Sequence, residues 1–434
     1  MAKARSAWVG HGLLNILEHG LARGMDAAAT LAILWCVPTE VFSQLAIAQA
    51  YVAPALFFFV SPETVLYREF GKWSDEGAAP MLTRLRVFRR FAWGKGILAV
   101  ILAAVLAFSF PSPSGTGFGF VDRFAALLWA FSLPLLPQVS GPDREYLRLD
   151  LDLKTLNFIT FFQRAVYLLL LVPAAKLFPH SFVMIAGCGA ATMLFTAWLA
   201  RKKVEAKFSG VVPTSIPEGS GFTLIRRSLE GFSVWNHVSG VIIGWVQTMD
   251  VFFLGWFRFP ASEVGIYSVA LKFANFTLAI PYAVSNLFVV FLGRTASPDR
   301  RRETRLLVRF SLILLAYAAV QAVVSYLLAP YVIHLFSRGR WTREEEARMV
   351  VWLKAILPAS AIFASSLFWT GWLGIRTSFS KLVATLYLPW AATSAGIYAW
   401  AIHTGGTDSA ARANLSVMGV FIFLLAVSSF RRYE

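Results

Sequence analysis

Residues 96–110 read GILAVILAAVLAFSF, a run without a charged side chain. A helix needs about 20 mostly apolar residues to span a bilayer, and with its flanking residues this run reaches that length. Similar runs recur along the whole chain. They predict an all-α membrane protein with twelve transmembrane helices, at about 11–36, 41–60, 91–110, 123–139, 155–178, 181–200, 232–257, 265–293, 306–329, 350–373, 381–402 and 413–430.

The composition excludes an ordinary cytosolic enzyme. The chain has 434 residues, of which 57% are hydrophobic and 15% charged. A soluble domain carries roughly 25% charged residues, so this chain has too few to cover a water-facing surface. Cys36 and Cys188 lie in apolar runs and predict no disulfide framework. The N-terminus shows no cleavable signal peptide, so the first span is expected to be an uncleaved anchor.

The net charge of +16 is explained by topology. Most of the 40 basic residues lie on alternate connections between the predicted spans and at both ends of the chain. By the positive-inside rule, this pattern predicts that the N- and C-termini are cytoplasmic. The cations then orient the chain and contact anionic lipids, and no nucleic-acid partner is expected.

Two halves of the sequence match. A Pro/Ser/Gly-containing segment, 206–231, is predicted to be a cytoplasmic linker between six-helix lobes at 1–205 and 232–434. Asp26 in span 1 corresponds to Asp250 in span 7. Prolines also correspond, in the pairs Pro54 and Pro281, Pro134 and Pro358, and Pro173 and Pro389. This pattern indicates two parallel repeats, although proline is also common in membrane helices for other reasons.

Polar side chains form stripes inside several predicted spans. Ionisable groups at membrane depth are costly and usually face a cavity or a partner. The stripes either line a cavity or form hydrogen bonds between helices, with Arg23 paired to Asp26. Basic groups exceed acidic ones inside the spans, which favours an anionic substrate group such as a phosphate. Lys95, Arg309 and Lys354 lie near span ends and are expected to snorkel.

Signals for catalysis and for metals are weak. Asp150 and Asp152 resemble the DxD motif of metal-dependent glycosyltransferases, but their short loop leaves no room for a nucleotide-binding domain. The histidines and cysteines have no metal-ligand spacing. The sequence predicts no catalytic residues, no metal site and no cofactor other than a coupling H⁺ or Na⁺. Thr342 to Glu345 predict a capping box that starts an amphipathic helix leading into span 10.

Three segments carry a resemblance to a known family. Residues 248–255 (TMDVFFLG), 262–268 (SEVGIYS) and 279–283 (AIPYA) resemble spans 7 and 8 of polysaccharide flippases of the O-antigen type. These belong to the multidrug/oligosaccharidyl-lipid/polysaccharide (MOP) exporter superfamily. Residues 330–336 (PYVIHLF) look similar too, whereas the N-terminal half matches only in layout.

The resemblance implies two six-helix lobes in a V around a cavity, and translocation of polyprenyl-pyrophosphate-linked sugars by alternating access. On this hypothesis Asp26 or Asp250 binds the coupling cation or proton. The other candidates are a set that holds the pyrophosphate (Arg23, Arg164, Lys272), a set that binds sugar (Gln49, Asn275, Tyr282) and a set that lines the cavity (Asn15, His19, His237, Gln247).

Two alternative functions stay open. One is a drug or small-metabolite antiporter of the same fold, although the basic excess disfavours cationic drugs. The other is a non-transporting membrane subunit of a polysaccharide synthase, which would scaffold a glycosyltransferase through its basic cytoplasmic loops. The expected partners are the lipid bilayer, an anionic lipid-linked glycan, and the glycosyltransferases or polymerase of a polysaccharide pathway.

Overall fold

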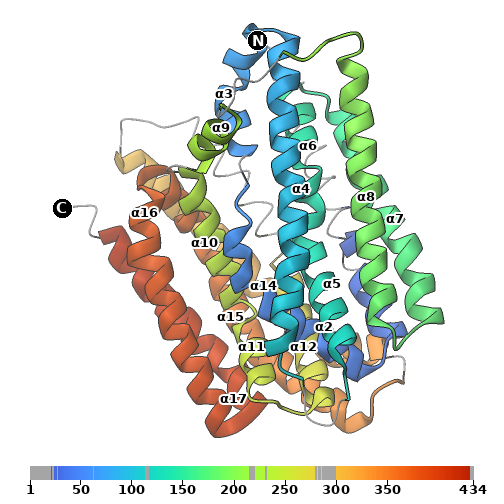
Figure 1. Cartoon of the computed structure of the whole chain (residues 1–434). Helices are drawn as coiled ribbons and strands as arrows, with labels where there is room; N and C mark the ends of the chain where they lie inside the picture. Colours follow the sequence, from blue (N-terminus) through green and yellow to red (C-terminus); the bar gives the residue numbers. More distant parts are fainter. Residues whose placement is uncertain are drawn as a thin grey trace. The chain divides into compact units, whose positions relative to one another are not determined.

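The protein is helical, and no β-strand occurs among the residues that the structure describes (Figure 1). The structure is a computed structural model. It describes residues 21, 24–26, 28–61, 63–112, 117–214, 220–229, 232–278, 281, 285, 300–337 and 339–430. Much of predicted span 1 and the end of span 8 therefore lie outside the described residues.

The chain divides into two compact units. The first comprises Met1–Phe110 and Gly117–His237, and the second Pro111–Thr116 and Val238–Glu434. The elements up to the boundary are α2 (Thr39–Val52), η1 (Pro54–Phe58), α3 (Glu63–Asp75), α4 (Ala78–Ser109), α5 (Phe120–Val139), α6 (Gly141–Leu149), α7 (Leu153–Leu177), α8 (Phe182–Lys207) and α9 (Ser220–Leu229). The boundary falls within α10 (Phe232–Val246). The remaining elements are α11 (Met249–Trp256), α12 (Ala261–Phe276), α14 (Arg300–Ser337), α15 (Arg343–Arg376), α16 (Phe379–Leu382), η2 (Val383–Tyr387) and α17 (Leu388–Phe430).

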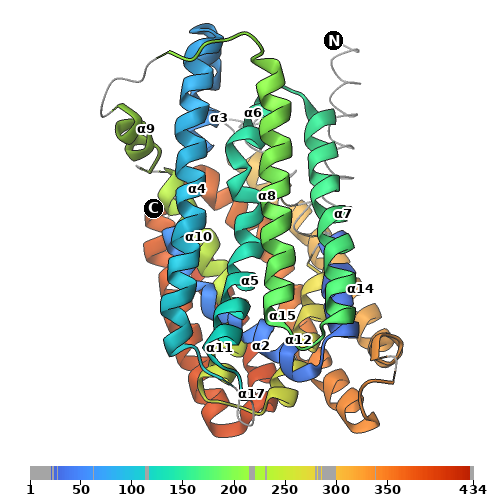
Figure 2. The ribbon, with the colours of Figure 1, turned by 45° about the vertical axis from the view of Figure 1, so that its right-hand side comes forward.

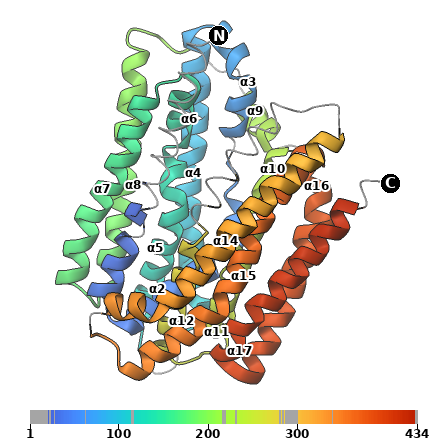
Figure 3. The ribbon, with the colours of Figure 1, turned by 180° about the vertical axis from the view of Figure 1, so that it is seen from behind.

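Each unit is built around one central helix. In the first unit, α5 packs against α2, α4 and α8, and α4, α5 and α8 run side by side in Figure 2. In the second, α15 packs against α12, α14 and α17 (Figure 3). In terms of the predicted spans, span 4 packs on spans 2, 3 and 6 in the first unit. In the second unit, span 10 packs on spans 8 and 9 and on the continuous helix that contains spans 11 and 12. The equivalent neighbours confirm the predicted pseudo-symmetric lobes.

The described helices make a multi-pass membrane protein. Six are long and apolar enough to cross a membrane, and the pair α10 and α11, bent by 57°, forms a seventh candidate. One of the six runs from Phe379 to Ser429 and contains predicted spans 11 and 12. Spans 2 and 8 coincide with the shorter helices α2 and α12, and span 4 with α5. The missing N–H of Pro54 explains why α2 gives way to a 3₁₀ turn there.

Four predicted connections contain helices instead of loops. The connection after span 2 holds α3, the connection after span 4 holds α6, and the predicted linker 206–231 holds α9. Predicted spans 11 and 12 join through α17. α17 is interrupted only at Gly405 and Gly406, where the backbone leaves the helical region. The predicted capping box is confirmed, because the Thr342 hydroxyl accepts from the Glu345 N–H and the Glu345 carboxylate accepts from the Thr342 N–H.

Candidate functional sites

In the first unit, Arg164 on α7 forms an ion pair with Asp26. Arg164 Nη1 lies 2.8 Å from Asp26 Oδ1. The Asp26 side chain is 39% exposed and that of Arg164 is 18% exposed, so the pair lies at an accessible surface of this unit. The sequence assigned these residues separate roles, substrate cation and coupling carboxylate. The structure brings them together, and the alternative partner Arg23 lies outside the described residues.

Two more candidate residues, Gln49 and His237, lie near the point in the first unit where α2 ends and the 3₁₀ turn η1 begins. Gln49 is half-buried near the end of α2, a turn before Pro54. His237 Nε2 lies 2.9 Å from the carbonyl oxygen of Leu56, in the 3₁₀ turn η1. This contact fixes the His237 ring against a turn that Pro54 creates. The cavity-lining candidates Asn15 and His19 are outside the described residues, so their placement stays a prediction.

The buried ammonium of Lys95 corrects the sequence interpretation. Lys95 was expected to snorkel to the interface, but its side chain is 4% exposed. Its Nζ donates to the Gln138 side-chain oxygen at 3.2 Å and to the Val60 carbonyl at 3.4 Å. The Lys95 side chain can stay buried between helices because Gln138 on α5 and the Val60 carbonyl after η1 accept hydrogen bonds from its ammonium group.

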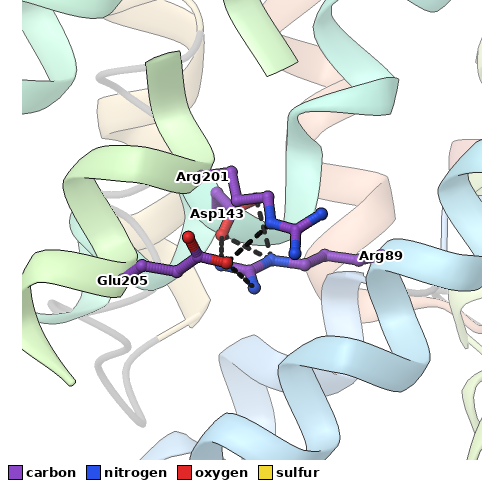
Figure 4. Close-up of polar contacts among 4 residues, drawn as sticks. All are labelled: Arg89, Asp143, Arg201 and Glu205. Carbon is purple, nitrogen blue, oxygen red and sulfur yellow. Dashed lines mark hydrogen bonds and ion pairs between the residues drawn. The ribbon is translucent and has the colours of Figure 1, made fainter. Parts of the chain in front are cut away.

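A network of charges lies at one end of the first unit, among α4, α6 and α8 (Figure 4). Arg89 on α4 donates to both oxygens of Asp143 on α6, at 2.5 to 3.1 Å, and both side chains are buried. Arg89 Nη1 also lies 3.6 Å from Glu205 Oε1 on α8. Arg201 Nε donates to the same Glu205 oxygen at 2.6 Å. These cations, predicted to set topology, also tie three helices together.

The DxD-like pair holds a lysine. Lys207 Nζ lies 2.8 Å from Asp150 Oδ2 and 2.9 Å from Asp152 Oδ2. Asp152 also caps α7 by accepting from the Thr155 N–H, and Leu151 between the acids takes a φ of 60°. Hydrogen bonding to Lys207 holds the pKa of Asp152 below its usual value. Both carboxylates of the DxD-like pair therefore bind the Lys207 ammonium in this structure. Nowhere in the described part of the chain do three His, Cys, Asp or Glu side chains form a metal-binding group.

In the second unit, Asp250 lies just after the break between α10 and α11. Its side chain is 1% exposed. Oδ1 accepts from the Val251 N–H at 2.8 Å, and Oδ2 accepts from the Tyr267 hydroxyl at 2.6 Å. The Asn414 amide lies 3.5 Å from the same Oδ2. The carboxylate that the sequence singled out therefore lies in the first turn of α11, next to the break between the two helices.

The partners of Asp250 come from distant parts of the second unit. The Tyr398 hydroxyl donates to the Asn414 side-chain oxygen at 3.0 Å, which orients the amide donor toward Asp250. Trp352 packs edge-on against Tyr267, with ring centroids 5.7 Å apart, and donates to Asp408. Sequence reasoning missed Tyr267, Tyr398 and Asn414. Tyr267 stood within the quoted motif 262–268, but its role depends on a contact that only folding creates.

The other candidates of the second unit do not gather around Asp250. Lys272 and Asn275 are both half-buried on α12. Lys272 follows Tyr267 by five residues, which turns it about 140° around the helix axis. Gln247 is half-buried at the α10 break, beyond the exposed Gly240 and Gly244. Among the described residues, no basic side chain forms an ion pair with Asp250, and Tyr282 is outside them.

Solved structures with this fold are known. An inward-facing multidrug resistance MATE family transporter of the MOP superfamily matches with a TM-score of 0.61, 13% identity and 96% coverage of both chains. The lipid II flippase MurJ, in an inward closed conformation, matches with a TM-score of 0.63 and 12% identity, over 96% of this chain and 86% of the flippase. A mutant of the Vibrio cholerae MATE transporter VcmN matches with a TM-score of 0.58 and 13% identity, over 97% of this chain and 92% of VcmN.

No protein-family model matches the sequence, and no curated protein sequence matches it. The structural likeness covers nearly the whole chain at identities of 12 to 13%. It therefore shows the fold and confirms, at that level, the resemblance drawn from the sequence motifs.

Proposed function

Because the chain has the fold of MOP transporters, we propose that it carries an anionic lipid-linked oligosaccharide across a bacterial cytoplasmic membrane by alternating access. The substrate class is a polyprenyl-pyrophosphate glycan, and the chain termini are cytoplasmic. The fold neighbours are transporters or a flippase, which supports a carrier over an enzyme. The observation that carries the substrate assignment is the accessible Asp26–Arg164 pair within the first unit.

The Asp26–Arg164 pair gives the carrier an exchangeable anion site. A guanidinium binds phosphate oxygens through paired hydrogen bonds, as it binds a carboxylate. The substrate pyrophosphate can therefore replace Asp26 on Arg164 without leaving the cation uncompensated. The side chain of Asp26 is 39% exposed in the unit, so the carboxylate has room to move away from Arg164. When substrate leaves, Asp26 returns to Arg164 and keeps the empty site neutral.

We assign the coupling ion to Asp250 and not to Asp26. Asp26 has an arginine partner, whereas Asp250 is buried and held by hydrogen bonds with no basic partner among the described residues. A buried carboxylate without a counter-ion is costly, and a bound H⁺ or Na⁺ removes that cost. One charge crossing about 150 mV supplies roughly 3.5 kcal/mol, enough to drive a gradient of several hundredfold.

The test is flipping of a fluorescent polyprenyl-pyrophosphate oligosaccharide in liposomes. Arg164→Gln should slow flipping roughly ten- to a hundredfold, because a charge-assisted hydrogen bond contributes about 1.5 to 3 kcal/mol. Arg164→Lys should retain part of the activity. The matched control is Arg201→Gln, an exposed arginine outside the site. Normal flipping by Arg164→Gln protein of wild-type stability would refute the assignment. In cells, alanine at both Arg23 and Lys272 should abolish surface polymer.

A drug or small-metabolite antiporter is the second candidate, because the MATE transporters match the fold as well as the flippase does. Deletion of the gene separates the two functions. Loss of glycan display with unchanged dye efflux supports the flippase, and the reverse supports the antiporter. Co-purification with a glycosyltransferase and no flipping in liposomes would instead support a synthase subunit.

A further inference from the structure

The first unit contains a cavity that the proposed transport sites do not use. It lies where α4 ends and α5 begins, at the end of the unit predicted to face away from the cytoplasm, and the two helices run side by side (Figure 2). Its volume is about 410 Å³, within the range of about 300 to 1,000 Å³ typical of small-molecule sites. The described residues that line it are Ala107, Phe108, Phe118, Gly119, Phe120 and Arg123.

Three phenylalanine rings form most of the wall of this cavity. Phe108 at the end of α4 and Phe120 at the start of α5 have ring centroids 4.9 Å apart. Phe118 packs edge-on against the buried Phe182 of α8, at a centroid distance of 5.0 Å. Phe108 is 78% exposed and Phe120 is 45% exposed, so the aromatic wall opens to the surroundings of the unit. Such a wall suits hydrocarbon.

An apolar stripe on α4 leads to the cavity. The large exposed side chains of this helix recur every three or four residues and therefore share one face. We call them the α4 stripe; they are Ile97, Ile101, Val105 and Phe108, each between 54% and 78% exposed. The opposite face of α4 carries the small buried residues Ala99, Ala103 and Ala107. The exposed apolar surface of a helix that crosses a membrane is solvated by acyl chains, so an acyl chain can follow the stripe to the cavity.

One cation, Arg123, lies in the wall of the cavity. It is four residues after Gly119, the N-cap of α5. Its guanidinium Nε is buried without a hydrogen-bond partner, and Arg123 forms no ion pair with another described residue. A cation near the positive end of a helix dipole does not stabilise the helix, so the dipole does not explain this arginine. The charge of Arg123 is complementary to an anion from outside the chain.

The acid next to Arg123 is engaged by the backbone. Asp122 Oδ2 accepts from the Gly119 N–H at 3.3 Å, which caps α5, and Asp122 is not among the described lining residues. The exposed Lys176 and His180 lie at and after the end of α7, and they do not line the cavity either. Arg123 is therefore the only charged side chain among the described residues of the wall.

We propose that this cavity binds one phospholipid of the leaflet away from the cytoplasm. Its phosphate lies at Arg123, and one of its acyl chains follows the α4 stripe. A guanidinium binds phosphate oxygens through charge-assisted hydrogen bonds, and lipid phosphates lie at the edge of the hydrocarbon core, where the apolar part of α4 ends. A soluble anion would leave the rings of Phe108 and Phe120 uncovered. The proposal is independent of the transported substrate, so it stands or fails separately from the proposed function.

The experiment is native mass spectrometry of the full-length protein in detergent. The protein is titrated with phosphatidylglycerol and, separately, with a diacylglycerol that has the same acyl chains but no phosphate. The bound lipid that Arg123→Gln removes reports the cavity. We expect phosphatidylglycerol to fill this site to half-saturation at a roughly tenfold lower concentration than diacylglycerol, because a charge-assisted hydrogen bond is lost without the phosphate.

The variants separate the phosphate contact from the acyl contact. Arg123→Gln should raise the half-saturating concentration of phosphatidylglycerol roughly tenfold and leave that of diacylglycerol unchanged. The matched control is Lys176→Gln, which removes an exposed cation outside the cavity and should change neither. Phe108→Ser should weaken the binding of both lipids, whereas Leu169→Ser, at a side chain 72% exposed on α7, should weaken neither. Circular dichroism confirms that each variant is folded.

Three results would overturn the proposal. The first is equal half-saturation by the two lipids, and the second is an equal effect of Lys176→Gln and Arg123→Gln. The third is displacement of bound phosphatidylglycerol by a trace of a polyprenyl-pyrophosphate oligosaccharide, which would assign the cavity to the transported substrate.

Discussion

At the scale of single residues, charges that serve topology also serve packing. Arg89 and Lys207 belong to the basic residues that predict cytoplasmic connections, yet each meets acidic partners from other helices. The sequence singled out Asp26, Arg164 and Asp250 as polar groups within apolar runs. It could not supply their partners, because hydropathy identifies a costly charge but not the distant side chain that compensates it.

Removing one member of the buried Arg89–Asp143 pair should be strongly destabilising. Arg89→Met leaves the Asp143 carboxylate buried and uncompensated, so the free energy of unfolding should fall by about 3 to 5 kcal/mol. The double variant Arg89→Met/Asp143→Leu should recover most of this loss. Denaturant unfolding of the detergent-solubilised protein measures both. Arg201→Met, at a side chain 60% exposed, should cost less than about 1 kcal/mol. A small effect of Arg89→Met alone would contradict the role of the pair.

The Asp152–Lys207 contact predicts acid sensitivity. The folded pKa of Asp152 lies below its usual 3.8 because Lys207 hydrogen-bonds the carboxylate. The contribution of this group to stability is therefore present above about pH 3.8 and is lost as the pH falls through the lower folded pKa. Thermal unfolding as a function of pH should show a smaller acid-induced loss in Lys207→Gln than in the wild type. The same loss in both proteins would show that Lys207 does not perturb Asp152.

Asp250 should determine ion dependence. In Asp250→Asn protein, flipping in liposomes should no longer respond to an imposed H⁺ or Na⁺ gradient, because the neutral amide cannot exchange a cation. Exchange of labelled for unlabelled substrate should continue. Tyr267→Phe removes a single hydrogen bond and should weaken ion dependence without abolishing it. Gradient-driven flipping by Asp250→Asn at the wild-type rate would exclude this residue as the coupling site.

At the scale of helices, apolar length was predictable and the connections were not. α14 and α15 contain predicted spans 9 and 10, whereas α4, α7 and α8 each fall one residue short of the predicted span at one end and extend beyond it at the other. α3, α6 and α9 were missed because they are too short and polar for a hydropathy criterion. The predicted loop 403–412 is helical except at Gly405 and Gly406. The Thr407 hydroxyl donates to Glu263, and the Asp408 carboxylate accepts from the Trp352 indole N–H. These side-chain contacts hold in place a connection whose sequence is polar.

The turn in α17 should depend on Gly406. Its φ is +62°, and an added Cβ would lie 3.1 Å from the Phe259 ring. Left-handed backbone costs a residue with a side chain about 1 to 2 kcal/mol, so Gly406→Ala should lower stability by at least that amount. Gly396→Ala, at an exposed position on the same helix with open space for a Cβ, should be neutral or stabilising by up to about 1 kcal/mol. Thermal unfolding in detergent compares them, and equal midpoints would contradict the strain.

At the scale of the whole molecule, the sequence predicted the fold more fully than the sites. Length, hydropathy and matched prolines indicated two similar helical lobes, and α5 and α15 have equivalent neighbours in the structure. The fold depends on many apolar residues, so its signal accumulates along the chain. The sites depend on a few polar contacts, such as Asp250 with Asn414, between residues 164 positions apart.

The predicted orientation has a direct test. In a variant without Cys36 and Cys188, single cysteines replace Asp75 or Thr404, both exposed. A membrane-impermeant maleimide should label Thr404→Cys in intact cells and Asp75→Cys only after permeabilisation. The reverse result would invert the predicted topology.

The ion pairs of Lys207 with Asp150 and Asp152 also bear on how the protein folds during synthesis. Synthesis runs from the N-terminus, and Asp143, Asp150 and Asp152 emerge before Glu205 and Lys207. All five residues leave the exit tunnel of the ribosome before α14 begins at Arg300. The nascent chain can therefore join the ends of α4, α6 and α8 while most of the second unit is still unmade. N-terminal parts of a chain generally fold first during synthesis. We expect a ribosome stalled after Phe276 to display a first unit whose ion pairs are already formed.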